Sequence, residues 1–375
     1  MKKKESIDLA KAVAAINDKY GEGAISTGSS HPPVVRVPTG YIGLDYALGG
    51  GGMPLKRKLE VVGAFSSGKT LIMTKLIRAF QRFDFANGVP NVIEKIHFDE
   101  KKMKITKVDL VKGYKPVKPV EAGIPAVIDA EGSFDKAWAK LHGVDTSALL
   151  IMQPSSSAEA LNTMEMLTLS DLVSLVCLDS VAVLAPESEL DTALGESSAL
   201  GSAQRLLGQA TRKLTAAMNS TNNDKVAYYI INRKYDKISM YGGSSVWGGN
   251  ALKLFKDIAL ELTAKESKVK EVVVGKHINI KNTKNKTGSA HREIEMYLDF
   301  VGNEHTPKND FDRVMQTVDL AIAYEVVKRK GSYFTYYDVT EQGKEAFVTA
   351  ILKKEEAGKT YFEYMEDEVK EAMEA

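Results

Sequence analysis

A glycine-rich segment, Gly63 to Thr70, carries residue types suited to binding phosphate groups. It reads Gly-Ala-Phe-Ser-Ser-Gly-Lys-Thr and fits the P-loop pattern G-x-x-x-x-G-K-[ST] at every specified position. An apolar run predicts a buried strand before it, over 59–62, and apolar residues at helical spacing predict a helix after it, over 71–82. In such a strand–loop–helix unit the backbone amides and the helix N-terminus favour negative charge. The segment therefore predicts a nucleoside-triphosphate site.

Each side chain of this segment has an expected contact with the triphosphate or its metal ion. We expect Lys69 to reach the β- and γ-phosphates and the hydroxyl of Thr70 to ligate Mg²⁺. Gly63 and Gly68 let the backbone wrap closely around phosphate. Ser66 and Ser67 complete the expected nucleotide contacts of the loop.

Two further apolar runs lead into carboxylates. The run over 124–130 is followed by Glu131, a candidate to orient or deprotonate the water that attacks the γ-phosphate, since the carboxyl ends of strands face the ligand crevice. An acid that complements a helix N-terminus would fit Glu131 equally well on local grounds. The second run, over 171–177, leads to Asp179, the candidate to hold the Mg²⁺ shell in the Walker-B arrangement.

Length and composition bound the class of protein. At 375 residues, one large domain with smaller attachments is expected, and 44% hydrophobic residues suffice for a sizeable core. The net charge of +1 excludes a global field that attracts nucleic acid, so any such binding must use local basic loops. The one cysteine, Cys177, excludes an internal disulfide framework. With no secretory h-region and no apolar stretch of about 20 residues, a cytoplasmic location and no membrane partner are expected.

The sequence alone does not assign a function to two segments that flank the P-loop unit. A helix begins near Ser6 and ends at Gly21, with one apolar stripe that packs either on its own core or on a neighbouring subunit. The stretch from about 83 to 123 is longer than an ordinary crossover and is expected to be an insertion with a β-hairpin. Its lysines are interspersed with acids and fit a solvated surface better than a binding patch.

The segment after the strand 226–231 mixes cations with aromatic rings around small residues. Basic and aromatic side chains in a loop suit single-stranded nucleic acid, with cations on phosphates and rings on bases, although an ordinary surface loop has a similar composition. An amphipathic helix before that strand carries Arg205 and Arg212. From about residue 303 the pattern changes to a small α+β module with an aromatic hairpin around 333–337.

The order of these motifs resembles the RecA family of recombinases. The strand, P-loop and helix are followed by Asp-Ala-Glu at 129–131, Leu-Asp-Ser at 178–180, and Ile-Asn at 231–232 before a glycine loop that ends in Gly-Gly-Asn-Ala-Leu-Lys at 248–253. Further segments that look like RecA lie in the same order at 20–25, 43–49, 209–214 and 284–286. The resemblance implies an α/β fold: a RecA-type P-loop ATPase core with a mostly parallel sheet over 37–302, an N-terminal oligomerisation segment over 1–36, and a C-terminal α+β domain over 303–375.

The resemblance also implies roles. Members of the family bind ATP with Mg²⁺ between adjacent subunits, form filaments on single-stranded DNA, and exchange strands with a homologous duplex in DNA repair. Glu131 then takes the position of the catalytic glutamate, Asp135 and Trp138 grip and stack the adenine, and Lys284 and Lys286 reach the γ-phosphate of the neighbouring subunit. The two DNA-binding loops fall at 187–202 and 234–248, and the expected DNA contacts are Arg205, Arg212, Lys234, Tyr235, Lys237, Tyr241, Gly248, Gly249 and Asn250.

Arg233 departs from the family pattern, which has glutamine directly after Ile-Asn. An arginine is longer, always charged and cannot accept a hydrogen bond, so it contacts either the phosphate or DNA and puts the coupling of ATP state to DNA affinity in doubt. Together with the insertion this indicates a divergent member, for which a viral origin is one explanation. Two alternatives stay open: a helicase or motor with the same core fold, and a structural DNA-binding filament regulated by ATP with weak exchange.

Overall fold

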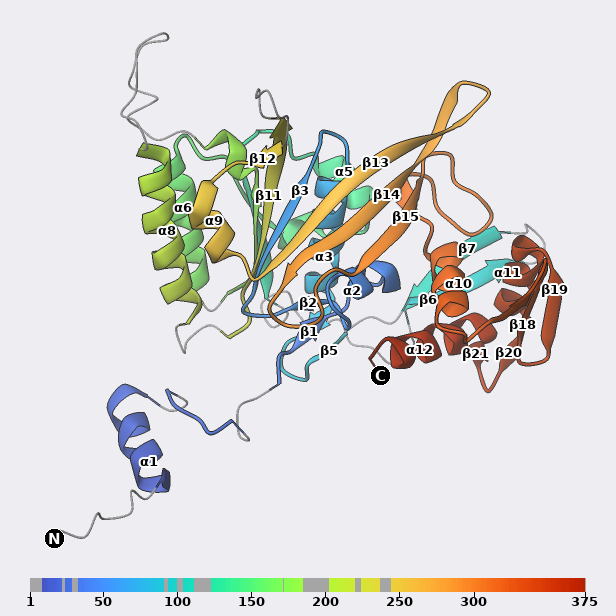
Figure 1. The fold of residues 1–375 in the computed structure, drawn as a ribbon, viewed down its shortest axis with the longest axis horizontal. Coiled ribbons are helices and arrows are strands. Elements are labelled where there is room, and N and C mark those ends of the chain that lie inside the picture. The colour runs from blue at the N-terminus through green and yellow to red at the C-terminus, as the bar shows by residue number, and fades with distance from the viewer. Residues whose placement is uncertain are drawn as a thin grey trace.

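A large sheet with helices on both faces forms the centre of the molecule (Figure 1). The computed structural model describes residues 9–21, 24–28, 33–90, 94–99, 104–110, 123–170, 172–184, 202–219, 224–236 and 244–374. Within these residues the strand order of the central sheet is β16-β15-β14-β13-β3-β11-β10-β8-β9, and β12 pairs with β11 at one end. The pairs from β13 through β9 are parallel and the pairs from β13 to β16 are antiparallel. The predicted α/β fold with a mostly parallel core is confirmed.

The strands of this sheet have the following bounds: β3 Lys58–Gly63, β8 Ile124–Asp129, β9 Leu150–Met152, β10 Val173–Asp179, β11 Ala227–Asp236, β12 Ser244–Val246, β13 Ile258–Val269, β14 Val272–Asn285, β15 Glu293–Asp299 and β16 Asp310–Phe311. All residues of β3 and β10 are buried, as expected for parallel strands covered on both faces. The strands predicted from the apolar runs before the P-loop, before Glu131 and before Asp179 are therefore present.

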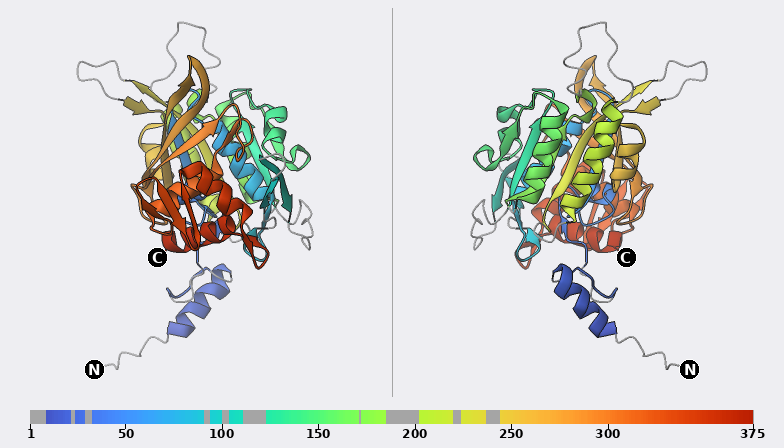
Figure 2. Two further views of the ribbon diagram at one scale, coloured as in Figure 1. Left: turned by 90° about the vertical axis from the view of Figure 1, so that its right-hand side faces the viewer. Right: turned by 90° about the vertical axis from the view of Figure 1, so that its left-hand side faces the viewer.

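Successive residues of these strands point to opposite faces, which gives the core two layers. Val127 and Cys177 join the cluster packed under α3, whereas Ile128 and Leu178 join the cluster packed under α6 and α8. The two end views in Figure 2 show helices on both sides of the sheet. The helices that cover it are α2 Ile42–Ala47, α3 Lys69–Gln81, α5 Lys136–Leu141, α6 Ser157–Leu169, α8 Ser202–Met218 and α9 Gly249–Phe255, with short 3₁₀ turns at Thr146–Ala148 and Val181–Val183.

The C-terminal module has its own hydrophobic cluster, built around buried Phe347 and Phe362. Its elements are α10 Arg313–Ala323, β17 Lys328–Lys330, β18 Tyr333–Tyr336, β19 Val339–Gln342, α11 Lys344–Lys353, β20 Glu355–Glu356, β21 Lys359–Thr360 and α12 Tyr361–Glu374. The aromatic hairpin expected near 333–337 is present as β18 and β19. The apolar spacing predicts one helix over 314–327. The helix α10 ends at Ala323 instead, because Glu325 adopts a left-handed φ of 61° that a helix cannot continue through.

The segment expected to be an insertion contains two small hairpins. One pairs β4 (Phe83–Asp84) with β5 (Val89–Pro90), and the other pairs β6 (Glu94–Asp99) with β7 (Lys104–Leu110), so the predicted hairpin is confirmed. Near the N-terminus, β1 (Arg36–Val37) pairs with β2 (Met53–Pro54). The N-terminal helix α1 (Leu9–Tyr20) has no buried residue and stands away from the sheet (Figure 1), so it does not pack on the core of its own chain. The expected cap at Ser6 lies outside the described residues.

A buried lysine links the P-loop helix to the last strand of the sheet. Lys75 of α3 is 1% exposed, and its Nζ lies 2.7 Å from Asp310 Oδ1 and 3.1 Å from His142 Nδ1. Burial lowers the pKa of Lys75 to about 8 although Asp310 opposes the shift, and burial together with the charge of Lys75 lowers the pKa of His142 to about 4. The hydroxyl of Tyr41 donates to the same carboxylate at 2.9 Å. The carboxylate of Asp310 on β16 therefore connects α3, through the ion pair with Lys75, to the start of α2, through the hydrogen bond from Tyr41.

We expect Asp310→Asn to lower the free energy of unfolding by about 3 kcal/mol, because it leaves the buried ammonium without its counter-charge. Urea unfolding measures this, and Lys75→Met added to Asp310→Asn should regain part of the loss. Lys344→Ala removes the more exposed pair with Asp319 and serves as a control with a cost below about 1 kcal/mol. An Asp310→Asn midpoint equal to that of the unaltered protein would show that this pair contributes nothing to stability.

Candidate nucleotide site and neighbouring loops

The glycine-rich loop bridges the end of β3 and the start of α3. Gly68 caps α3 with a left-handed φ of 93°, and a Cβ there would lie 2.8 Å from Ile278 Cδ1. A Cβ on Gly63 would lie 2.4 Å from Ser67 Oγ and 2.9 Å from Leu262 O, so a side chain has no room. Within the described residues Ser67 Oγ is buried and has no hydrogen-bond partner, while Ser66 has a φ of 55°. An orphaned hydroxyl inside a glycine cradle fits a bound phosphate.

Lys69 folds back over this loop. Its Nζ donates to the carbonyl oxygens of Gly63 at 2.9 Å and Ala64 at 2.6 Å. Its own carbonyl accepts a hydrogen bond from the Tyr229 hydroxyl at 2.7 Å, which ties the first turn of α3 to β11. Burial lowers the pKa of Lys69, the charge of Arg233 lowers it further, and Asp179 acts in the opposite direction. No sequence pattern singled out Tyr229, which lies in the buried first part of β11, over residues 227–232.

The two residues expected to hold Mg²⁺ lie together. Thr70 Oγ1 donates to Asp179 Oδ2 at 3.2 Å, across 109 positions of sequence. Burial, and next the negative charge of Glu131, raise the pKa of Asp179 to about 6. A hydroxyl and a carboxylate oxygen at the mouth of a phosphate cradle fit Mg²⁺, which takes one or two protein ligands and completes its shell with phosphate and water oxygens.

Glu131 is held from both sides. Its Oε1 accepts from Ser180 Oγ at 2.5 Å, and its Oε2 accepts from an Arg233 guanidinium nitrogen at 2.6 Å. The next helix, α5, starts only at Lys136 and has no acid in its first turn. The helix N-terminus alternative for Glu131 is therefore excluded, and the carboxylate lies beside Asp179 at the carboxyl edge of the sheet, where the backbone N–H of Glu131 donates to Asp179 O at 3.2 Å. No sequence pattern singled out Ser180 as a contact of Glu131, although this residue directly follows the end of β10.

The residues expected to meet the adenine lie at the start of α5. Asp135 caps this helix, and its Oδ1 accepts from the backbone N–H of Ala137 at 2.7 Å and of Trp138 at 3.2 Å. Trp138 is half-buried, with its ring centroid 4.4 Å from that of His142. One carboxylate oxygen of Asp135 is therefore used by the helix cap, and the stacking role of Trp138 stays a prediction.

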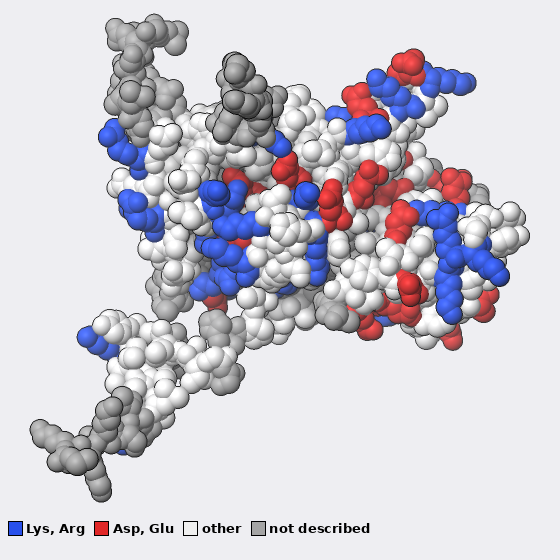
Figure 3. Space-filling model, in the orientation of Figure 1, with Lys and Arg blue, Asp and Glu red and all other residues white. Residues whose placement is uncertain are grey.

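The expected DNA contacts that the structure describes lie on α8, on β11 and at the start of α9. Lys234 forms an ion pair with Glu261, and Tyr235 pairs through its backbone with Ser245 of β12. Gly248 and Gly249 have φ values of 93° and 55° and start α9, which contains Asn250. Arg205 and Arg212 are exposed on α8, and Figure 3 shows Lys and Arg side chains gathered over the α8 and α9 side of the molecule. Lys237, Tyr241 and residues 187–201 of the first expected loop lie outside the described residues.

Lys284 and Lys286 lie two strands away from β3 and toward the start of that strand, whereas the P-loop of the same chain follows its end. Lys284 pairs in register with Ala259, which pairs with Glu60 near the start of β3. Lys284 Nζ donates to Lys253 O at 3.0 Å and Lys256 O at 2.7 Å. Lys286 Nζ donates to Asp257 Oδ1 at 3.0 Å and is about half exposed. Neither lysine contacts the glycine loop of its own chain.

A glycine-rich loop between β3 and α3 at the carboxyl edge of a parallel sheet, with an acidic residue closing a neighbouring strand, defines the P-loop class of proteins. The family model of the RecA N-terminal domain matches residues 7–112 and 116–303. The protein RecA of Chlorobium limicola is 34% identical over 364 residues, covering 93% of this chain and 90% of the relative. Protein RecA of Thermus aquaticus is 31% identical over 363 residues, covering 95% of this chain and 92% of the relative. The chain therefore belongs to the RecA family.

The membership confirms the family resemblance read from the motif order, and with it the RecA-type core. Among the described helices, none is long and apolar enough to cross a bilayer.

Proposed function

We propose that this protein is a DNA-dependent ATPase that forms filaments on single-stranded DNA and exchanges strands with a homologous duplex. The observation that carries the proposal is the convergence, at one edge of the sheet, of the phosphate cradle, the Thr70–Asp179 pair and Glu131, beside the strand β11 that leads from Arg233 into the expected second DNA loop. Family membership supports the same activity, together with roles in recombination and repair.

In this proposal each residue has one task in ATP hydrolysis. Lys69 leaves its two loop carbonyls and donates to the β- and γ-phosphates, while Thr70 and Asp179 hold Mg²⁺. When bound, Mg²⁺ neutralises charge on the phosphate oxygens. Glu131 accepts a hydrogen bond from the attacking water and takes up its proton as the bond from the water oxygen to the γ-phosphorus forms and the bond to ADP breaks.

The position of Lys284 and Lys286 supports an action between subunits. The register separates Lys284 from the P-loop by about three residues along β3, roughly 10 Å, and by two strand spacings of about 5 Å each. A cation that cannot reach its own site can serve the site of the next subunit, as an arginine finger does in trans. The apolar stripe of α1 supports the same assembly, because the described part of the chain buries no residue of this helix.

We expect Lys284→Ala combined with Lys286→Ala to reduce DNA-stimulated hydrolysis by at least about 100-fold while ATP binding by monomers persists. Mixing this variant with Lys69→Ala should regain activity, because each inactive subunit supplies what its neighbour lacks. Sedimentation with single-stranded DNA establishes that the mixed assembly forms. A mixed assembly on DNA that remains inactive would contradict action in trans.

Electron microscopy of assemblies on DNA separates the recombinase from a ring-forming motor. With ATP, Mg²⁺ and single-stranded DNA of two lengths, we expect filaments whose length grows in proportion to the DNA. Rings of constant size on both DNA lengths would contradict the proposal and favour a motor.

A second candidate, an ATP-regulated DNA-binding filament with weak exchange, is favoured by one observation. Arg233 forms an ion pair with Glu131, the expected general base. A base that is held in an ion pair is expected to support only slow hydrolysis. Measured exchange of a homologous strand distinguishes this candidate from the recombinase.

A further inference from the structure

The ion pair between Arg233 and Glu131 occupies the carboxylate that hydrolysis needs. Arg233 donates to Oε2 at 2.6 Å and Ser180 donates to Oε1 at 2.5 Å, so both carboxylate oxygens already accept hydrogen bonds from the protein. A general base must lie within hydrogen-bond reach of the water it activates, and each oxygen of Glu131 already uses one of its two lone pairs. With its charge neutralised and both oxygens engaged, Glu131 is poorly disposed to take a proton.

The guanidinium of Arg233 is accessible to another anion that could replace Glu131 as its partner. Its side chain is 47% exposed, whereas that of Glu131 is 19% exposed, so the guanidinium lies on the solvent side of the pair. Arg233 closes the parallel part of β11, paired with Gly63, and the next residue already pairs with β12. An arginine offers only donors, and phosphate oxygens are among the acceptors it binds best. A strand of DNA lying along β11 and β12 therefore brings the acceptors that can take this guanidinium from Glu131.

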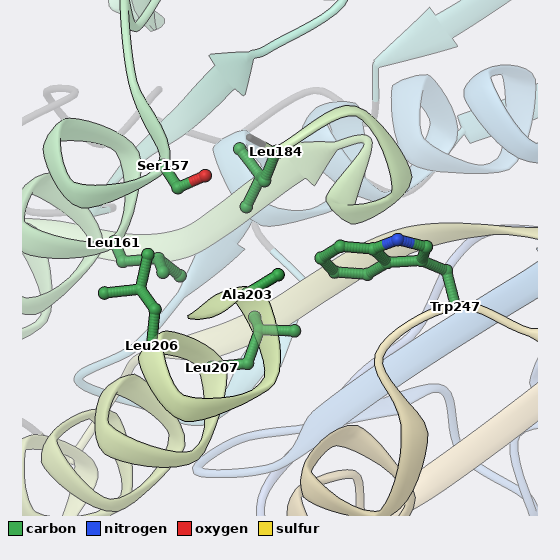
Figure 4. Close-up of a pocket in the computed structure, with 7 residues that line it drawn as sticks. All are labelled: Ser157, Leu161, Leu184, Ala203, Leu206, Leu207 and Trp247. Carbon is green, nitrogen blue, oxygen red and sulfur yellow. The ribbon is translucent and has the colours of Figure 1, made fainter. Parts of the chain in front are cut away.

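The backbone at Arg233 is also tied to the anchors of both expected DNA loops. Asn232 Oδ1 accepts from the Arg233 N–H at 2.8 Å, and Asn232 Nδ2 donates to Trp247 O at 2.9 Å and to Glu60 Oε1 at 2.8 Å. The indole of Trp247 is turned toward Leu184 and Ala203 in an apolar pocket (Figure 4). Leu184 and Ala203 flank the first expected loop, and Trp247 closes the second. A displacement of Trp247 at this pocket can therefore reach Arg233 through Asn232.

We propose that Arg233 is a positioning residue that restrains Glu131 until single-stranded DNA is bound, when a DNA phosphate replaces the carboxylate as the partner of the guanidinium. This inference rests on the proposed ATPase function. It gives the departure from the family glutamine a physical role: a neutral amide could hydrogen-bond Glu131 without neutralising it, whereas arginine adds an ion pair that DNA must break. DNA stimulation of hydrolysis then arises by releasing a base that is already in place.

Arg233→Gln tests the restraint by steady-state ATP hydrolysis with and without single-stranded DNA. We expect the DNA-free kcat to rise about fivefold with little change in KM, the factor that corresponds to an exposed ion pair of roughly 1 kcal/mol, and the stimulation by DNA to shrink accordingly. Arg233→Lys keeps the cation and should retain the low DNA-free rate. Lys213→Gln is the matched control, since it removes a pair with Glu165 of similar exposure, 50% and 23%, away from the site.

The outcomes separate this inference from the function it rests on. If the unaltered protein hydrolyses no ATP under any condition, the proposed function fails. If DNA stimulates the unaltered protein but Arg233→Gln leaves the DNA-free kcat the same or lowers it, the restraint is overturned and the ATPase stands. An equal rise for Lys213→Gln would also overturn it, because the effect would not be specific to Glu131.

Fluorescence tests the connection through Trp247 independently of turnover. The chain has two tryptophans, so Trp138→Phe leaves Trp247 as the sole reporter. We expect single-stranded DNA to shift the Trp247 emission in this background, with and without Arg233→Gln. Saturating DNA binding, followed by anisotropy of labelled DNA, with no change in Trp247 emission would overturn transmission through this pocket.

Discussion

Replacing Lys69 with alanine is expected to reduce ATP hydrolysis at least about 100-fold while the fold remains intact. The side chain contacts only loop carbonyls in the described structure, at 2.9 and 2.6 Å, and belongs to no hydrophobic cluster. Its removal therefore changes the free energy of unfolding by less than about 1 kcal/mol. The loss of rate follows from removing a cation directed at the charge that develops on the transferring phosphoryl group.

Steady-state hydrolysis with saturating single-stranded DNA measures this effect, and thermal unfolding checks the fold. Lys281→Ala, which removes an exposed lysine paired with Glu293 on β14, is the control and should leave both quantities unchanged. Hydrolysis by Lys69→Ala at the rate of the unaltered protein would mean that the glycine-rich loop is not the phosphate site.

Replacing Asp179 with asparagine is expected to abolish Mg²⁺-dependent hydrolysis and to stabilise the fold. Burial and the charge of Glu131 raise the pKa of Asp179 from 3.8 to about 6, so the folded protein binds this proton more tightly than the unfolded chain does. Stability attached to this group is therefore present at low pH and is lost as the pH rises from about 4 to 6. Above pH 6 the cost reaches up to about 3 kcal/mol, which the uncharged amide removes.

Denaturant unfolding without Mg²⁺ at pH 7.5 and at pH 4 measures this second prediction. The variant should be more stable than the unaltered protein at pH 7.5, and the difference should shrink at pH 4, where the carboxyl of Asp179 is protonated in the folded protein and partly protonated in the unfolded chain. Addition of Mg²⁺ with ATP should stabilise the unaltered protein more than the variant, since only a carboxylate offers the ion a charged ligand. A variant that is less stable at both pH values would contradict the burial of a charge at this position.

The local parts of the site could be predicted from the sequence because short patterns determine them. The glycine positions, the lysine and the following hydroxyl of the P-loop lie within eight residues, and their conformation depends on the strand and helix at either side. Asp179 and Glu131 end apolar runs, and parallel strands bring such ends to one edge of the sheet. The hairpin of β6 and β7 likewise follows from period-2 alternation.

Contacts between distant residues could not be predicted in this way. The pair between Arg233 and Glu131 joins residues 102 positions apart, and its formation depends on the register of β11 beside β10 and β8. Lys75 has the same spacing as the apolar face of α3 but is a cation, and only its contact with Asp310 explains its burial. The end of α10 depends on one left-handed residue that carries no glycine signal.

The most direct test of the proposed function is the exchange of a labelled strand between single-stranded DNA and a homologous duplex, with ATP hydrolysis followed in the same reaction. We predict that single-stranded DNA stimulates hydrolysis, that the labelled strand is exchanged only when the two DNAs share sequence, and that Lys69→Ala supports no hydrolysis in the same assay. Stimulated hydrolysis without transfer of the homologous strand would contradict the recombinase and leave the ATP-regulated filament or the motor as the function of this chain.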